Sequence, residues 1–397
     1  MEGEKILKGA MSWPFLRLYL LVLLYFSANA ILNVIIPLQG GALGATNTTI
    51  GVIMGAYLFT TMFFRPWAGH IIQEHGPIKV LHIILVVNGI ALILYPFTGL
   101  GGYLIARMMQ GVSTAFFSMA LQIGIIDALP EEDRSQGISL YSLFSYIPGI
   151  LGPVLALSIW QQGMDLFMVV MVGIAIITGL VGFNVKMESK KERSQSTAIN
   201  QSANVLSSFR EIVKNPFLFK CSVLMLTASI VFGAVTTFVP LYAKEIERGN
   251  AGLYLMLQAA VVVIGRFTLR KRIPSDGKWH PVFMMGAMFI LTLASYSISF
   301  ASREGAIFFY LGAFLMGIAQ ALIYPTLTTY LSFVLEQNNR NILLGLFIAM
   351  ADLGVSLGGI IMGPIADISS YSFMYGICSV LGLLMVLFAY EKRENAH

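Results

Sequence analysis

Residues 18–36, LYLLVLLYFSANAILNVII, decide the class of this protein. Basic residues precede the stretch, and Ala-Asn-Ala at residues 28–30 has the form of a signal-peptidase site, so its first half could be taken for a secretory signal. The apolar residues continue past that site to Ile36, however, which makes the run long enough to cross a bilayer as a helix. We therefore expect an uncleaved first transmembrane helix.

Apolar runs of this kind recur from one end of the chain to the other. Of the 397 residues, 57% are hydrophobic and only 11% are charged, whereas a soluble domain carries roughly 25% charged residues. Side chains with so little charge cannot cover a surface that faces water, so lipid is the expected solvent for most of the chain. The pattern predicts an all-α polytopic membrane protein with about twelve transmembrane helices.

One long polar stretch interrupts this pattern, from Met187 to Asn215. It is rich in Ser, Asn, Gln and basic residues, a composition that cannot form a packed core. We interpret it as a cytoplasmic linker. The predicted organisation is a six-helix bundle at residues 1–186, a linker at 187–215 and a second six-helix bundle at 216–397.

The two halves share a spaced pair of residues. Arg65 and Gly76 bracket the predicted loop after the second span, and Arg266 and Gly277 bracket the loop after the eighth at the same separation. Other glycine and arginine pairs recur in the same order at a similar offset. A duplicated six-helix unit is typical of transporters whose substrate site lies between the two repeats near the middle of the membrane.

The distribution of basic residues predicts the orientation. If the N-terminus is cytoplasmic, the 25 Lys and Arg residues fall on the cytoplasmic side except for Lys244, Arg248 and Arg303, which fall outside, and Arg107, which falls within a span. This asymmetry follows the positive-inside rule and places both termini in the cytoplasm. Because the positive charge is spread over many loops, it does not indicate a nucleic-acid surface.

The chain offers little that resembles an enzyme. It has two cysteines, Cys221 and Cys378, which lie in or beside apolar segments without the spacing of metal ligands. It contains no zinc motif, phosphate-binding loop or nucleophile elbow. We expect neither catalysis nor a bound metal cofactor.

Among the acidic residues, Asp352 alone falls near the centre of a predicted span. A carboxylate at that depth is costly as an anion and tends to bind a proton or a partner. Proton coupling is one interpretation. A structural carboxylate that is hydrogen-bonded between helices, or a contact to the substrate, are the alternatives.

Arg107 is the corresponding basic residue, within two turns of the outer end of the fourth span. Its side chain could extend to the outer surface of the membrane. Alternatively, it is a fixed cation that attracts an anionic group or competes with a proton, with Gln110 one turn further along the helix.

Polar residues concentrate in the first, fourth, seventh and tenth spans. Asn29 and Asn33 are one turn apart on one face of the first span. Hydrogen bonds between helices would explain many of these residues, and a central cavity is the functional alternative. The candidate substrate-binding residues are Arg107, Asn29, Asn33, Gln110, Gln320 and Tyr324.

Three motifs resemble those of the major facilitator superfamily, and the resemblance covers the whole chain. Arg65-Pro66-Trp67-Ala68-Gly69, followed by Gly76, resembles the loop motif; Arg107-x-x-Gln110-Gly111 resembles the helix-four motif; and Gly149-x-x-Gly152-Pro153 resembles the antiporter motif of proton-coupled exporters. The chain departs from the usual patterns at two places. Gln73 and Glu74 stand where the loop motif has Asp and Arg, so the charge interaction between helices that this motif usually provides is in doubt. The antiporter motif ends in Ala156-Leu157 rather than in paired glycines.

A closer resemblance is to the staphylopine-type exporters of Gram-positive bacteria. The stretches that carry it are SANAILNV at 27–34, GIIDALPEE at 124–132, IPSDG at 273–277 and ADLG at 351–354. The resemblance implies export of an opine-type metallophore for metal acquisition. Such a molecule is similar to nicotianamine and carries several carboxylates and amines, for which Arg107 would be a partner.

The expected function is therefore proton-coupled secondary active export of an opine metallophore across the plasma membrane, with Asp352 taking up a proton from outside and Arg107 taking part in the coupling. The proton gradient would replace any cofactor, and the protein would act as a monomer in the lipid bilayer. The alternative is a multidrug/proton antiporter that exports lipophilic or cationic compounds. An importer on the same fold also stays open, since direction is not written in the helices.

Overall fold

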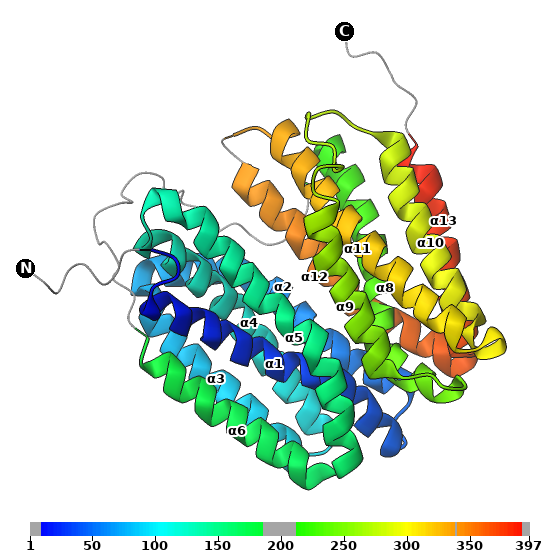
Figure 1. The fold of residues 1–397 in the computed structure, drawn as a ribbon, viewed down its shortest axis with the longest axis horizontal. Helices are drawn as coiled ribbons and strands as arrows, with labels where there is room; N and C mark the ends of the chain where they lie inside the picture. Colours follow the sequence, from blue (N-terminus) through cyan, green and yellow to red (C-terminus); the bar gives the residue numbers. More distant parts are fainter. Residues whose placement is uncertain (1–8, 186–211, 338–339, 391–397) are drawn as a thin grey trace, which may run out of the picture. The chain divides into compact units, whose positions relative to one another are not determined.

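The computed structural model describes residues 9–185, 212–337 and 340–390, and within these ranges the regular elements are helices (Figure 1). Twelve of the helices are long and apolar enough to cross a membrane, which confirms the predicted all-α fold with about twelve spans. The first six long helices are α1 (Trp13–Ala42), α2 (Asn47–His75), α3 (Pro77–Phe97), α4 (Leu100–Ala128), α5 (Arg134–Gln162) and α6 (Met164–Phe183). The others are α8 (Pro216–Tyr242), α9 (Ala251–Thr268), α10 (Pro281–Glu304), α11 (Ala306–Val334), α12 (Arg340–Ile368) and α13 (Tyr371–Ala389), with short 3-10 helices η1 (Glu131–Asp133) and η2 (Ala243–Glu245).

The chain forms two compact units. The first unit comprises residues 1–35 and 56–203, and the second comprises residues 36–55 and 204–397. The end of α1 and the start of α2 therefore group with the second unit. Most of the predicted linker, 187–215, falls on residues 186–211, which lie outside the described ranges, so the predicted division stays a prediction.

In the first unit, α3 packs against α4 and α6, and α5 contacts α4 and α6. The core beside α4 is aromatic: the rings of Tyr25 and Phe117 stack with centroids 3.7 Å apart. Gly152 brings α5 close to α1, because a Cβ atom added there would lie 2.5 Å from the Cβ of Ala30. A small residue at that point lets two helices approach more closely than larger side chains would allow.

In the second unit, α8 packs along α12, α10 lies between α11 and α13, and α11 also contacts α9. Gly354 and Gly358 of α12 lie against the backbone of α8; a Cβ atom at Gly354 would be 2.5 Å from the carbonyl oxygen of Leu226. The outward faces are apolar, with Ile307 and Val282 each 80% exposed. Large exposed apolar side chains of this kind suit contact with lipid rather than water.

The prediction of a loop between Arg65 and Gly76 is wrong. Helix α2 continues through Arg65 and Gly69 to His75, and Gly76 by itself separates α2 from α3. Hydropathy marks where the apolar segment ends, but the helix continues beyond that point. Gly76 has φ +84°, a conformation that L side chains rarely adopt, and Pro77 then begins α3.

Candidate functional site

Arg107 lies inside the first unit and is 0% exposed. Its Nη1 donates a hydrogen bond to the Oδ1 of Asn29, and its Nη2 donates one to the Oδ1 of Asn33, each at 2.7 Å. Asn29 and Asn33 are four residues apart in α1, so their carboxamides project from one face of that helix. The spacing matches the fork of a guanidinium group, whose donors are fixed in one plane.

The guanidinium group also lies over an aromatic ring. The Cζ of Arg107 is 5.2 Å from the ring centroid of Tyr57 in α2, a cation–π distance. The hydroxyl of Tyr57 shares a hydrogen bond of 3.0 Å with the Oγ1 of Thr114, and the hydroxyl of Tyr25 shares one of 3.1 Å with the same atom. A polar network therefore joins α1, α2 and α4 around the cation.

Gln110 lies one turn after Arg107 on α4 and is buried. Its Oε1 accepts a hydrogen bond of 2.6 Å from the hydroxyl of Tyr95 in α3. This bond fixes which end of the amide faces Tyr95, so the position of Gln110 is set by α3 as well as by α4.

The burial of Arg107 argues against one of its two interpretations, in which the side chain extends to the outer surface of the membrane. The side chain is buried within the unit and does not extend to the surface. The carboxamides of Asn29 and Asn33 orient the guanidinium group through these two hydrogen bonds. In general, the planar fork of a guanidinium group can donate two parallel hydrogen bonds to a carboxylate.

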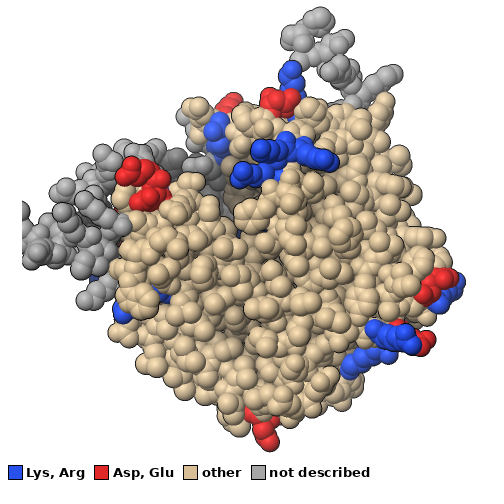
Figure 2. All heavy atoms as spheres, in the orientation of Figure 1, with Lys and Arg blue, Asp and Glu red and all other residues tan. Residues whose placement is uncertain are grey.

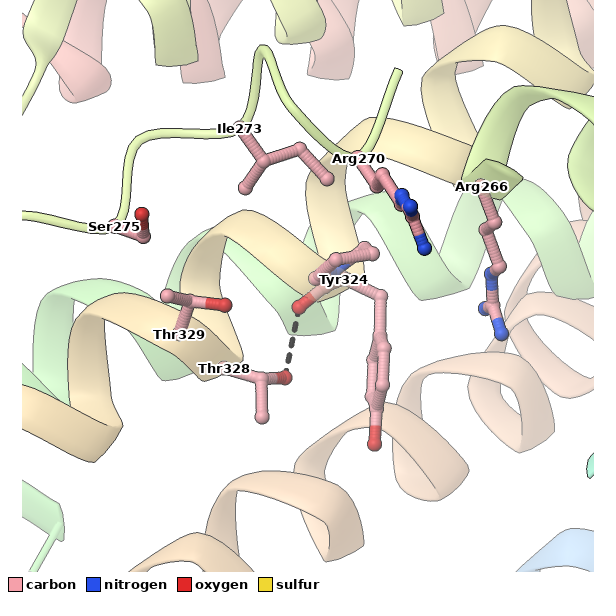
Figure 3. Close-up of a pocket in the computed structure, with 8 residues that line it drawn as sticks. Arg266, Arg270, Ile273, Ser275, Tyr324, Thr328 and Thr329 are labelled. Carbon is pink, nitrogen blue, oxygen red and sulfur yellow. Dashed lines mark hydrogen bonds between the residues drawn. The ribbon is translucent and has the colours of Figure 1, made fainter. Parts of the chain in front are cut away.

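Gln320 and Tyr324 belong to the second unit, one turn apart on α11. The Nε2 of Gln258 donates a hydrogen bond of 3.3 Å to the Oε1 of Gln320. The ring of Tyr324 lies 6.0 Å from the Cζ of Arg266 and borders a cavity of about 470 Å³ (Figure 3). The structure thus brings Arg107, Asn29, Asn33 and Gln110 together in one unit, and Gln320 and Tyr324 in the other.

Asp352 lies near the middle of α12 and is partly buried. It is 12 residues from Arg340 and 16 from Ile368, the two ends of the helix. At 1.5 Å of rise per residue, Asp352 is about 18 Å along the helix axis from one end and about 24 Å from the other.

The residues of the predicted loop motif and those of the predicted antiporter motif lie in different helices. Arg65 and Gly69 lie in the body of α2, whereas Gly149, Gly152 and Pro153 lie in α5. Gly152 packs against Ala30, the residue next to Asn29. The glycine of the antiporter motif therefore sets the distance between α5 and the part of α1 that holds Arg107.

Sequence reasoning missed Tyr57 and Tyr95. Tyrosines in apolar helices are typical of membrane interfaces, so their number in the chain does not distinguish a site residue from an anchor. Both lie on other helices than Arg107, and the packing of helices brings them near it. The occurrence of hydroxyl and amide side chains within the apolar parts of adjacent spans would have been a useful signal for these residues.

The described residues contain no group of three or more His, Cys, Asp or Glu side chains that could hold a metal ion. Cys221 and Cys378 are buried free thiols in α8 and α13. These thiols pack in the second unit as small apolar groups.

The family model of the Major Facilitator Superfamily matches residues 18–302 and 277–397. The staphylopine export protein of Staphylococcus aureus strain Mu50 is 55% identical over 390 residues, which cover 98% of this chain and 98% of that protein. Multidrug resistance protein 2 of Bacillus subtilis strain 168 is 20% identical over 363 residues, 88% of each chain. Among solved structures, the nucleoside transporter NupG superposes with a TM-score of 0.75 at 14% identity, covering 94% of this chain and 97% of that one, which shows a shared fold.

Proposed function

Because the chain belongs to the Major Facilitator Superfamily, we propose that it is a proton-coupled exporter of an opine-type metallophore. The observation that carries the substrate is the 55% identity to a staphylopine export protein along 98% of both chains. The cargo would be a small polycarboxylate with several amines, similar to nicotianamine. The protein would serve metal acquisition by releasing this molecule outside the cell.

The geometry around Arg107 supports a carboxylate-bearing cargo. A carboxylate that reached the guanidinium group would meet donors already oriented by Asn29 and Asn33. Little reorganisation is then needed, and preorganised partners bind more tightly than flexible ones. Gln110, fixed by Tyr95, would offer a further polar contact one turn away.

Sequence similarity favours the multidrug alternative less than metallophore export. The relative with a multidrug name is 20% identical to this chain, far below the staphylopine exporter. Multidrug export therefore stands second.

We further propose that both termini are cytoplasmic and that the protein resides in the plasma membrane. The turn between α9 and α10 carries Arg270, Lys271, Arg272 and Lys278, which suits a cytoplasmic loop. The connection between α8 and α9, with Lys244 and Arg248, would be outside. Two six-helix halves with cytoplasmic ends require this alternation of loops.

Asp352 would couple export to the proton gradient. Asp352 is near the middle of α12. Within a membrane its carboxylate would be unfavourable as an anion, so proton binding and release would accompany changes in its surroundings. No cofactor is needed, because the proton gradient supplies the driving force. In this proposal Arg107 binds the cargo. Its positive charge would also favour the deprotonated state of any acidic group close to it.

Transport into inverted membrane vesicles tests the proposal. The lumen of such vesicles corresponds to the outside of the cell, so an acidic lumen should drive accumulation of staphylopine added to the medium. We expect accumulation, measured by mass spectrometry, that needs both the protein and the gradient and is abolished by a protonophore. Absence of accumulation, in vesicles that contain the protein and hold the gradient, would contradict the proposal, and accumulation of ethidium instead would place multidrug export first.

A further inference from the structure

The start of α2 packs on α12 within the second unit, which includes residues 36–55 as well as residues 204–397. The two helices meet backbone to backbone. A Cβ atom added at Gly359 would lie 2.7 Å from the carbonyl oxygen of Gly51, and one added at Gly363 would lie 2.6 Å from that of Asn47. Glycine at these points lets the helices approach more closely than larger residues would allow.

The face of α12 that α2 covers is the face that carries Asp352. Ser356 follows Asp352 at i+4. Gly359 and Gly363 follow it at i+7 and i+11, so all four residues share one side of the helix. A Cβ atom added at Gly55 of α2 would lie 2.7 Å from the carbonyl oxygen of Ser356. The contact between residues 47–55 of α2 and residues 356–367 of α12, here called the α2–α12 seam, therefore begins one turn from Asp352.

The residue at this end of the seam has an unusual hydroxyl group. Ser356 is 0% exposed, and among the described residues its Oγ has no hydrogen-bond partner. A buried hydroxyl without a partner is unfavourable, because it loses its hydrogen bonds to water and gains none in return. Water that entered the seam would satisfy this hydroxyl and would then be one helical turn from Asp352.

The other end of the seam is held by Asp367. Its carboxylate accepts the N–H of Asn47 at 2.7 Å, and it accepts the N–H and the hydroxyl of Thr48 at 2.9 and 2.6 Å. The hydroxyl of Tyr371 donates to the Oδ1 of Asn47 at 2.6 Å. A carboxylate at the start of a helix is stabilised by the N–H groups that have no partner within the helix and by the helix dipole. Asp367 therefore fastens the first turn of α2 to the end of α12.

The end of the seam at Asp367 is accessible to water. Asp367 is exposed, and 15 residues separate it from Asp352, about 22 Å along the helix axis at 1.5 Å per residue. Figure 2 shows charged side chains at the margins of the visible face and almost none over its middle, as expected where the ends of spans meet water. In the proposed orientation, the connections α1–α2 and α12–α13 both lie outside the cell.

We propose that the α2–α12 seam is an outer gate over the face of α12 that carries Asp352, and that Asp367 is its latch. While the latch is formed, the backbone of α2 covers the path along α12 from the outside toward Asp352. Release of α2 from Asp367 would let the two helices separate and admit water as far as Ser356. A transporter must expose its coupling site to one side at a time. The role of Asp352 rests on the proposed function, whereas the gate rests on the contacts.

Labelling of a thiol placed under the seam tests the gate. Ser356→Cys is introduced into the full chain after Cys221→Ala and Cys378→Ala have removed the two native thiols, which are buried. A membrane-impermeant, positively charged methanethiosulfonate is added to right-side-out membrane vesicles, and the labelling rate is measured by mass spectrometry. We expect slow labelling in this background and at least about tenfold faster labelling when Asp367→Asn is added.

Two control variants and a second way to open the seam accompany this test. Glu304→Gln removes an exposed carboxylate from the end of α10, on the same side in the proposed orientation. Gly359→Ala opens the seam without a change of charge, because its Cβ would lie 2.7 Å from the carbonyl oxygen of Gly51. Gly345→Ala is its control on the same helix, since nothing described lies within 4 Å of the Cβ added there. We expect Gly359→Ala to speed labelling and the two controls to change it by no more than about twofold.

Three results would overturn the gate. The first is fast labelling of the background protein. The second is an equal rate for Asp367→Asn and Glu304→Gln, or for Gly359→Ala and Gly345→Ala. The third is acceleration in inverted vesicles alone, where the reagent meets the cytoplasmic side. Because labelling needs neither cargo nor a proton gradient, the gate would stand even if metallophore export were disproved.

Discussion

The Nη1 of Arg107 on α4 donates a hydrogen bond of 2.7 Å to the Oδ1 of Asn29 on α1. The donor is a fully buried cation and the acceptor is a neutral carboxamide. This pairing orients the guanidinium group. In the proposed function the oriented group meets a carboxylate of the cargo, and the first prediction follows from this proposal.

Asn29→Asp should abolish metallophore export while leaving the protein folded. The substitution preserves shape but places a carboxylate 2.7 Å from the guanidinium group, so the internal ion pair would compete with the cargo. Transport of staphylopine into inverted vesicles measures the effect, with membrane content and thermal stability as controls. Export by this variant at the rate of the unaltered protein would show that the positive charge of Arg107 does not bind the cargo.

Gly152→Ala should separate α1 from α5 and disturb the Arg107 site indirectly. The added Cβ would lie 2.5 Å from the Cβ of Ala30, so the backbone of one helix must shift, at a cost of about 1–3 kcal/mol. We expect a lower melting temperature and weaker transport. Gly173→Ala in α6 is the matched control, because nothing described lies within 4 Å of the Cβ added there. Equal effects of the two substitutions would contradict the interpretation.

Asp367 should stabilise the start of α2. Its carboxylate accepts the N–H of Asn47 at 2.7 Å, the N–H of Thr48 at 2.9 Å and the hydroxyl of Thr48 at 2.6 Å. It caps that helix from the end of α12. Asp367→Asn removes the charge and part of the acceptor capacity, which should cost about 1 kcal/mol and lower the melting temperature by a few degrees.

The control for this cap is Ser370→Ala. Ser370 is the N-cap of α13, and its hydroxyl accepts a single hydrogen bond of 3.2 Å from the N–H of Phe373. Its loss should matter less than the loss of a charged acceptor with three partners. A larger fall in melting temperature for Ser370→Ala than for Asp367→Asn would refute the capping role of Asp367.

Asp352→Asn should separate exchange from gradient-driven transport. The amide cannot bind and release a proton, so an acidic lumen should no longer drive accumulation in inverted vesicles. Exchange of labelled for unlabelled staphylopine at equal pH should continue, since it needs no net proton movement. Undiminished gradient-driven accumulation by this variant would remove Asp352 from the coupling step.

Much of the fold could be predicted from the sequence, because an apolar run of sufficient length has few alternatives in a membrane. The end of α2 could not, since His70 and His75 are polar yet continue the helix to Gly76. Hydropathy reports contact with lipid, whereas helix length also depends on hydrogen bonds and caps. The grouping of residues 36–55 with the second unit likewise depends on tertiary packing, which composition does not encode.

The candidate site was predicted in part. The spacing of Asn29 and Asn33 predicts a shared helix face, and the cost of a buried charge singles out Arg107. That these three side chains bind one another follows from the packing of α1 against α4, which no local pattern specifies. For the same reason the sequence did not indicate Tyr57, nor the pairing of Asp367 with Thr48.

The central claim is that this chain exports an opine metallophore. The most direct test supplies cells with the enzymes that make staphylopine, with or without this protein, and quantifies the cytosolic and medium pools by mass spectrometry. We expect the medium pool to rise and the cytosolic pool to fall when the protein is present, and we expect Arg107→Gln, although present in the membrane, to reverse both changes. Pools that do not move when the unaltered protein is in the membrane would contradict metallophore export.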